Sequence, residues 1–113
     1  ITVHADEKLL SQVLINLLKN AMQALEGQAD GKIRMEVDTE KNQLLIRVTD
    51  NGPGVPSDLI EDIFVPFFTT KATGSGIGLS LSRQIIRMHG GELSVASLPY
   101  RETCFTVSLP VKP

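Results

Sequence analysis

Two glycine-rich segments constrain the fold of this chain more than any other feature of its sequence. Residues 50–54 read D-N-G-P-G, and residues 74–78 read G-S-G-I-G. A stretch without clear periodicity separates them and contains F-V-P-F-F-T-T-K, and upstream lies the amide-rich segment L-I-N-L-L-K-N-A-M-Q-A-L. Because glycine permits tight turns and lets a ligand approach the backbone closely, this order predicts one binding site assembled from four segments.

The size and charge of the chain fit one ordinary soluble domain. Its 113 residues suffice for a modest core, so we place a single domain over residues 1–113. With 42% apolar residues, the composition is not that of a disordered chain. The net charge is −2, with acids and bases interspersed, which argues against nucleic acid or a membrane surface as the main partner. A local cationic pocket for an anion is still compatible with this balance.

The sequence also indicates a cellular compartment. No apolar run approaches the roughly 18–20 residues of a membrane span, and no signal peptide is recognisable. Cys104 is the only cysteine, which suits a reducing cytosol, and we predict that it is a small buried hydrophobe. The chain starts at Ile1 without an initiator methionine. We therefore expect an excised, cytoplasmic domain of a longer protein.

The first half of the chain predicts a helix and a hairpin. Apolar residues recur at helical spacing between residues 9 and 25, which indicates a helix of about twenty residues capped by Asp6. Two half-buried strands are predicted from alternation. They contain Ile33, Met35, Val37 and then Leu44, Ile46, Val48. Residues 41–42, Lys-Asn, mark the tight turn between them.

The second half predicts a short helix, a longer helix and two more strands. Ser57 could cap a short helix that ends at Ile63, and a second helix begins near Gly78 and stops at residues 90–91, Gly-Gly. Residues 93–95 and 105–109 read as strands, and residues 2–4 as a short strand or lead-in. Strands in adjacent pairs, interrupted by helices, predict an α+β two-layer sandwich.

The predicted first helix carries an unusual polar face. Its members fall within about a quarter-turn of one another, and all but one are amides. They are Gln12, Asn16, Lys19, Asn20 and Gln23. Amide oxygens can ligate a hard cation such as Mg²⁺ without repelling a nearby polyphosphate. An ordinary polar helix face is the alternative interpretation.

The D-N-G-P-G segment follows a predicted strand. Asp50 closes that strand with a carboxylate that can only accept hydrogen bonds, as the exocyclic amino group of adenine requires. The glycines allow the backbone to turn beneath a ligand. A plain Asn-Gly or Pro-Gly turn is the alternative, whereas a calcium loop is excluded because its ligand spacing is absent.

The G-S-G-I-G segment leads directly into a predicted helix at Gly78. Peptide N–H groups at a helix N-terminus bind phosphate, and Lys71 could reach a terminal phosphate as a mobile cation. The spacing is neither that of a dinucleotide fingerprint nor that of a P-loop. A flexible linker is the alternative. Phe64, Phe67 and Phe68 precede the glycines and predict local packing anchors.

No residue pattern predicts nucleophilic or zinc chemistry. His89 comes just before Gly90, where capping of a helix C-terminus explains it, and His4 has no base or metal partner nearby in the sequence. Neither a Ser-His-Asp set nor a Cys-His set can be assembled, and zinc spacing is absent.

Taken together, these segments resemble the catalytic, ATP-binding domain of bacterial sensor histidine kinases. That domain belongs to the GHKL superfamily, with DNA gyrase, the Hsp90 chaperone and the MutL repair protein. The resemblance covers roughly residues 1–110. Residues 16–21 look like the N box, 50–55 like the first glycine box, 64–71 like the F box and 74–79 like the second glycine box. The form P-F-F-T-T-K resembles kinases of the nitrogen-regulation type.

The resemblance implies a fold, ligands and roles for individual residues. The fold would be the Bergerat sandwich, a mixed sheet covered on one face by helices, and the ligands would be ATP and Mg²⁺. Asn20 would ligate Mg²⁺, Asn16 and Lys19 would contact phosphates, and Asp50 would bind the adenine amino group. Residues 56–73 would form the ATP lid. The other implied nucleotide contacts are Gly52, Gly54, Thr70, Lys71, Gly74, Ser75, Gly76, Gly78, Leu79 and Thr106.

The resemblance also implies a reaction and partners. Superfamily members that hydrolyse ATP place a glutamate four residues before the Mg²⁺-binding asparagine, whereas this chain has Asn16. The phosphoryl acceptor would be a histidine on a separate dimerisation domain that these residues lack, so the fragment has no catalytic nucleophile and should not autophosphorylate. A response regulator would act downstream. The fragment would be a monomer and the full kinase a homodimer, and a membrane anchor elsewhere in that kinase is compatible with this reading.

Two other functions fit parts of the sequence. A hydrolytic GHKL ATPase would need a general base, which Asn16 cannot supply. A degenerate module that binds nucleotide or a partner without chemistry would not need Asn20, Asp50, Lys71 and the box glycines together. One departure from the family is the turn S-L-P-Y-R-E-T-C-F before the last strand, where relatives have glycines.

Overall fold

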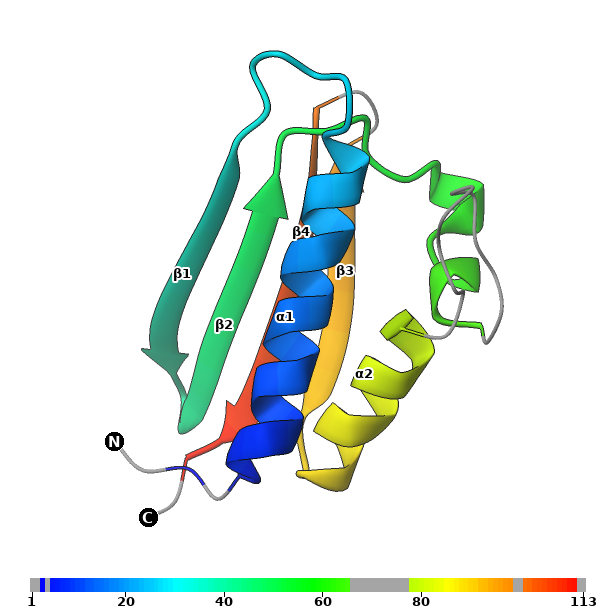
Figure 1. Ribbon diagram of the computed structural model, residues 1–113. Helices are drawn as coiled ribbons and strands as arrows, with labels where there is room; N and C mark the ends of the chain where they lie inside the picture. The colour runs from blue at the N-terminus through cyan, green and yellow to red at the C-terminus, as the bar shows by residue number, and fades with distance from the viewer. Residues whose placement is uncertain (1–2, 4, 66–77, 99–100, 112–113) are drawn as a thin grey trace.

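Two helices lie across one face of a four-stranded sheet, as Figure 1 shows. The computed structural model describes residues 3, 5–65, 78–98 and 101–111. Its helices and strands are α1 (Glu7–Ala24), β1 (Ile33–Glu40), β2 (Gln43–Asp50), α2 (Gly78–Met88), β3 (Glu92–Leu98) and β4 (Glu102–Pro110). Two short 3₁₀ turns, η1 (Ser57–Leu59) and η2 (Asp62–Phe64), precede residues 66–77. The α+β two-layer sandwich is confirmed.

The strand order is β1-β2-β4-β3, and every pairing among the described residues is antiparallel. The β1–β2 and β3–β4 hairpins form the two outer pairs of the sheet. The chain passes from β2 through α2 to the second hairpin, whose strand β4 pairs with β2. The expected mixed sheet is therefore antiparallel throughout the described part. Val3 belongs to no strand, while residues 2 and 4 lie outside the described residues. The β3–β4 hairpin forms without the glycines that relatives carry before the last strand.

Local signals in the sequence account for the element ends. The Asp6 carboxylate accepts a hydrogen bond from the Leu9 N–H at 3.1 Å and so caps α1. Lys41 and Asn42 both have positive φ, 49° and 65°, which confirms the predicted two-residue turn between β1 and β2. The predicted helix over residues 57–63 is wrong in type, because the segment forms two 3₁₀ turns. Ser57 does not cap them, since no side-chain hydrogen bond closes the first turn.

The core lies between the helices and the inner strands. Val13 and Leu17 of α1 pack in one buried cluster with Ile46 and Val48 of β2 and with residues of α2, β3 and β4. Burying an aliphatic side chain of this size stabilises a fold by about 1.5–3 kcal/mol. The opposite face of β4 carries Cys104, which is half-buried rather than buried as predicted.

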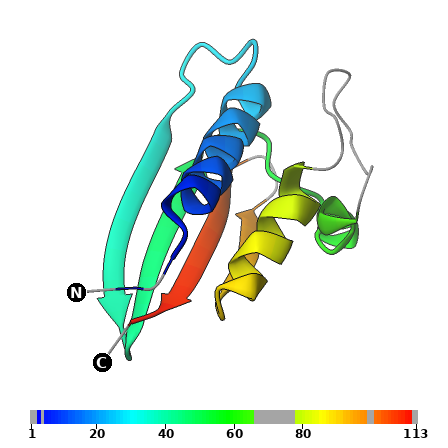
Figure 2. The ribbon, with the colours of Figure 1, turned by 60° about the horizontal axis from the view of Figure 1, so that its bottom comes forward.

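Strand β1 is more exposed than its alternating pattern predicts. Ile33, Met35 and Val37 are 38%, 48% and 61% exposed, although their register places them beside buried residues of β2. The prediction of a half-buried strand is wrong because α1 and α2 lie over β2, β4 and β3. In both views β1 is the edge of the sheet farthest from α2 (Figures 1 and 2).

His89 ties the C-terminal end of α2 to the N-terminal end of α1. Its Nδ1 lies 2.8 Å from the Ile85 carbonyl oxygen, and its Nε2 accepts a hydrogen bond from the Asp6 N–H at 3.0 Å. Since Nε2 is the acceptor, the proton of the neutral ring lies on Nδ1, which donates to the carbonyl. The capping role predicted for this histidine is confirmed, and it extends to a second helix.

Replacing His89 with alanine should lower the free energy of unfolding by about 1 kcal/mol, because two partly exposed hydrogen bonds are lost. Urea denaturation of the wild type and His89→Ala would measure this difference. Met88→Ala is the matched control, since Met88 is 69% exposed and should change stability by less than about 0.5 kcal/mol. Equal stabilities of the two variants would contradict a bridging role for the imidazole.

Candidate nucleotide-binding site

The side chain of Asn16 joins α1 to the start of α2. Its Nδ2 donates a hydrogen bond to the Ser82 Oγ at 3.0 Å. A Cβ atom at Gly78 would lie 2.5 Å from the Asn16 Oδ1 and 2.8 Å from its Nδ2. Glycine at position 78 is therefore what allows the Asn16 amide to lie against the first turn of α2, the end of a helix whose dipole favours an anion.

The D-N-G segment packs against the other end of α1. Asp50 is only 2% exposed, and its Oδ1 accepts a hydrogen bond from the Gly52 N–H at 2.9 Å. A Cβ at Gly52 would lie 2.8 Å from that oxygen and 3.2 Å from the Ala24 carbonyl oxygen. Gly54 has a φ of 78°, a conformation that side chains disfavour. This turn needs its glycines for close approach and for backbone conformation.

One stripe of α1 therefore runs from one glycine segment to the other. Asn16, Asn20 and Ala24 are spaced four residues apart, so they lie on one helix face over about 12 Å. Asn16 contacts Gly78 and Ala24 contacts Gly52, as described above, and Asn20 lies one turn from each. The structure thus brings Asn16, Asn20, Asp50, Gly52 and Gly78 to one region between α1, the β2 end and the α2 start, as the sequence predicts.

Asn51 is a structural part of this region that no sequence pattern predicted. The Asn51 Oδ1 accepts a hydrogen bond from the Lys32 N–H at 2.6 Å, and its Nδ2 donates to the Asp30 carbonyl at 3.0 Å. Gln28 Nε2 donates to the Asn51 carbonyl at 2.9 Å. These bonds fix the loop between α1 and β1 to the turn that follows Asp50. The Asn-Gly pair at residues 51–52 predicts a turn. It does not predict the hydrogen-bond partners of Asn51, because they lie about twenty residues earlier in the chain.

Thr106 was expected near the adenine, and the structure corrects this position. Thr106 lies opposite Arg47 of β2, on the face of the sheet away from the helices. Thr103 instead lies directly opposite Asp50 and is 5% exposed. Successive strand residues alternate between faces, so residues three apart point to opposite sides. Thr103 therefore takes the place of Thr106 in the candidate site.

The remaining predicted residues divide into two groups. Lys19 is exposed on α1, and Leu79 packs its side chain against the core, so Leu79 can offer only its backbone to a phosphate. The second group lies outside the described residues, which therefore leave these predictions open. It consists of Thr70, Lys71, Gly74, Ser75 and Gly76, together with the anchors Phe67 and Phe68.

Two arginines of α2 share one carboxylate of β3. Arg83 and Arg87 each donate through Nε to the Glu92 Oε1, at 3.2 and 3.1 Å. Partial burial raises the pKa of Glu92, but hydrogen bonds from Arg87, Arg83 and the Leu93 N–H, together with the charge of Arg87, outweigh it and hold the pKa below its ordinary value of 4.5. Because the folded-state pKa is lowered, this cluster stabilises the fold above pH 4.5 and loses that contribution as the pH falls further.

The donor set fits a nucleotide better than a metal bound by protein alone. Within residues 5–65, 78–98 and 101–111, no three His, Cys, Asp or Glu side chains gather to hold a metal ion. An Mg²⁺ ion here would need oxygens from an amide and from the phosphates of its ligand.

Neither of the described helices combines the length and the apolar character that crossing a bilayer requires.

Comparisons with known proteins identify relatives of this chain. The profile of a family described as histidine kinase-, DNA gyrase B- and HSP90-like ATPase matches residues 5–113. The signal transduction histidine-protein kinase AtoS of Escherichia coli K12 is 48% identical over 112 residues, which are 98% of this chain and 18% of AtoS. The sensor histidine kinase ZraS of Escherichia coli O157:H7 is 45% identical over 109 residues, 96% of this chain and 23% of ZraS.

A solved structure agrees with the fold. The catalytic domain of the histidine kinase ThkA, in a nucleotide-free form, superposes with a TM-score of 0.84 at 38% identity. The match covers 98% of this chain and 73% of the ThkA chain. The chain thus spans about a fifth of the length of the full-length kinases that it matches, and most of an isolated catalytic domain.

Proposed function

This chain belongs to the histidine kinase-, DNA gyrase B- and HSP90-like ATPase family, and we propose that it is the ATP-binding catalytic domain of a bacterial sensor histidine kinase. The observation that carries the proposal is the α1 face formed by Asn16, Asn20 and Ala24. This face runs from the turn that follows the buried Asp50 to Gly78, where α2 begins. The domain would bind Mg-ATP and present its γ-phosphoryl group to a histidine on a separate domain of the same kinase.

The adenine end of the proposed site is the β2 terminus. The Asp50 carboxylate accepts a hydrogen bond from the Gly52 N–H, and a carboxylate is the kind of acceptor that the adenine amino group needs. Thr103 lies across from Asp50 and adds a hydroxyl at the same level of the sheet. A buried carboxylate that accepts from the base selects adenine, because guanine carries a carbonyl oxygen at the corresponding position.

The phosphate end is the start of α2. The first turn of this helix offers peptide N–H groups, and Asn16 lies against it with a neutral amide. Lys19, exposed on the same side of α1, adds a cation that can reach the phosphates. We assign Asn20, between the two ends, as the ligand of an Mg²⁺ ion that neutralises phosphate charge when bound.

The reaction would be phosphoryl transfer without a base in this domain. The bond from the γ-phosphorus to the bridging oxygen breaks while a bond forms to an imidazole nitrogen of the acceptor histidine, and ADP leaves. A neutral imidazole needs no base to act as a nucleophile, so positioning and charge neutralisation suffice. Asn16 cannot deprotonate water, which disfavours hydrolysis as the main activity.

Substitution of Asn20 by aspartate should weaken Mg-ATP binding about tenfold, because it adds a negative charge beside the polyphosphate. Calorimetric titration at several Mg²⁺ concentrations would measure the affinity and its metal dependence. Gln12→Glu is the matched control, since it adds the same charge to the same helix face at an exposed position about two turns from Asn20. A Mg²⁺ dependence unchanged from wild type would remove Asn20 as the metal ligand.

The test of the proposed reaction is phosphotransfer in trans. The chain would be mixed with the histidine-bearing dimerisation domain of its parent kinase and with ATP labelled at the γ-phosphate. The proposal expects label on the histidine only when both domains are present, and ADP production by the chain alone at background level. Rapid ADP release by the chain alone would instead identify a hydrolytic ATPase. Three further points stay predictions. They are a response regulator downstream, a homodimer of the full kinase and a closer likeness to kinases of the nitrogen-regulation type.

A further inference from the structure

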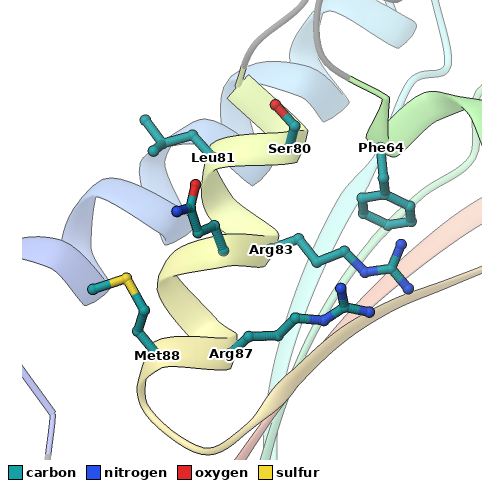
Figure 3. A pocket seen from close by; sticks show the side chains of 7 residues that line it. Phe64, Ser80, Leu81, Arg83, Arg87 and Met88 are labelled. Carbon is teal, nitrogen blue, oxygen red and sulfur yellow. The ribbon is translucent and has the colours of Figure 1, made fainter.

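Arg83, on α2, connects that helix to η2 and to β3. Its guanidinium carbon lies 4.2 Å from the centroid of the Phe64 ring in η2, and its Nε donates to Glu92 of β3 at 3.2 Å. Phe64 in turn meets Phe105 of β4 edge to face, with ring centroids 6.4 Å apart and an interplanar angle of 87°. A single side chain of α2 thus contacts η2 and β3 together. Figure 3 shows the Arg83 side chain beside the Phe64 ring.

Arg87 provides an internal comparison one turn further along α2. It pairs with the same Glu92, at 3.1 Å, but the contact with the Phe64 ring belongs to Arg83. The Arg83 side chain is 23% exposed, against 55% for Arg87. A cation–π contact strengthens as it is withdrawn from water, which favours the stack of the less exposed Arg83 on Phe64. Arg87 instead donates to both Glu92 oxygens, at 3.1 and 3.2 Å.

The contacts of Arg83 bear on the position of the α2 start. On the α1 side, the first turns of α2 are held by the hydrogen bond between Asn16 and Ser82 at 3.0 Å. On the outer side, α2 borders an open hollow of about 640 Å³, where Ser80, Leu81 and Met88 also lie (Figure 3). Asn16 thus holds α2 from the side of α1, and Arg83 holds it from the side of η2 and β3.

We propose that Arg83 is a positioning residue for the phosphate end of the site. By stacking on Phe64 and pairing with Glu92, it holds the first turn of α2 at the distance from Asn16 that phosphate binding needs. The effect on phosphate binding rests on the proposed function, whereas the contacts of Arg83 with Phe64 and Glu92 do not depend on a nucleotide. The adenine end, at Asp50 and Thr103, lies on other elements and should not sense Arg83.

The first test compares two ligands in two variants. In Arg83→Ala, ATP affinity measured by calorimetry should fall about tenfold while adenosine affinity stays within about twofold, since only ATP uses the α2 start. Arg87→Ala, which removes the other arginine from the same carboxylate, should leave both affinities near wild type. Equal losses for ATP and adenosine would indicate general destabilisation and overturn the proposal. Equal effects of the two variants would overturn it as well.

The second test needs no nucleotide. Hydrogen–deuterium exchange should accelerate in Arg83→Ala at residues 62–65 and at residues 78–82 together, and in Arg87→Ala at neither segment. Unchanged exchange at either segment in Arg83→Ala would show that Arg83 does not couple them. If the wild type binds neither ATP nor adenosine, the proposed function fails, while the exchange experiment still decides whether Arg83 holds η2 and α2 together.

Discussion

Substitution of Asp50 by asparagine should weaken ATP binding about 100-fold, because the exchange replaces a side chain with two acceptor oxygens by an amide that also donates. The carboxylate is 2% exposed, and one oxygen already accepts from the Gly52 N–H at 2.9 Å. The adenine amino group would then meet an amide that cannot offer two acceptor oxygens. Calorimetric titration with a non-hydrolysable ATP analogue measures the loss directly.

The control for this variant is Asp38→Asn, which makes the same chemical change on exposed β1 and should bind as the wild type does. A fold control is also needed, because Asp50 holds the turn of its own segment. The amide oxygen introduced by the substitution can still accept from the Gly52 N–H, so the thermal transition should remain cooperative. Wild-type affinity in a folded Asp50→Asn variant would refute the assignment of the adenine end.

Substitution of Gly91 by alanine should lower the free energy of unfolding by roughly 3 kcal/mol or more, because the new methyl group would collide with a backbone atom. A Cβ at this position overlaps the Ser108 carbonyl oxygen of β4 and lies 3.2 Å from the Ile86 Cγ2. The Gly91 N–H also donates to the Ile86 carbonyl at 3.0 Å, so neither side of the contact can move freely. Urea denaturation, or failure to recover folded protein, would report this effect.

Gly90 offers the comparison for that result. It has a φ of 78°, and among the described residues a Cβ there would meet only the Pro110 Cγ, at 3.6 Å. Gly90→Ala should therefore cost about 1 kcal/mol, the strain of a left-handed residue, without a collision. If both variants lost the same stability, close packing of β4 against position 91 would not be the reason for its glycine.

Local patterns in the sequence predicted most of the fold. The helical spacing of α1, the Asp6 cap and the Lys41-Asn42 turn each depend on residues within a few positions, and the structure confirms all three. The exposure of β1 could not be predicted in this way. Alternation shows that a strand has an apolar face, whereas coverage of that face depends on where the helices lie across the finished sheet.

The candidate site also combines residues that local motifs predict with residues that only the tertiary structure reveals. Asp50, Asn16 and Gly78 carry their own signals in sequence motifs, and the structure brings them to one region. The alternation of Phe105, Val107 and Leu109 already places Thr106 on the face away from the core, and this signal was overlooked. That Thr103 lies opposite Asp50 could not be predicted, because the register is set by pairing between β2 and β4. The contact of Arg83 with Phe64 was equally hidden, since it joins residues on either side of a stretch without periodicity.

The most direct measurement is a calorimetric titration of this chain with a non-hydrolysable ATP analogue, with and without Mg²⁺. The proposed site predicts saturable 1:1 binding that tightens when Mg²⁺ is present, since Asn20 and the phosphates would share the ion. The absence of heat and of competition at millimolar analogue, in protein that melts cooperatively, would contradict nucleotide binding by this domain.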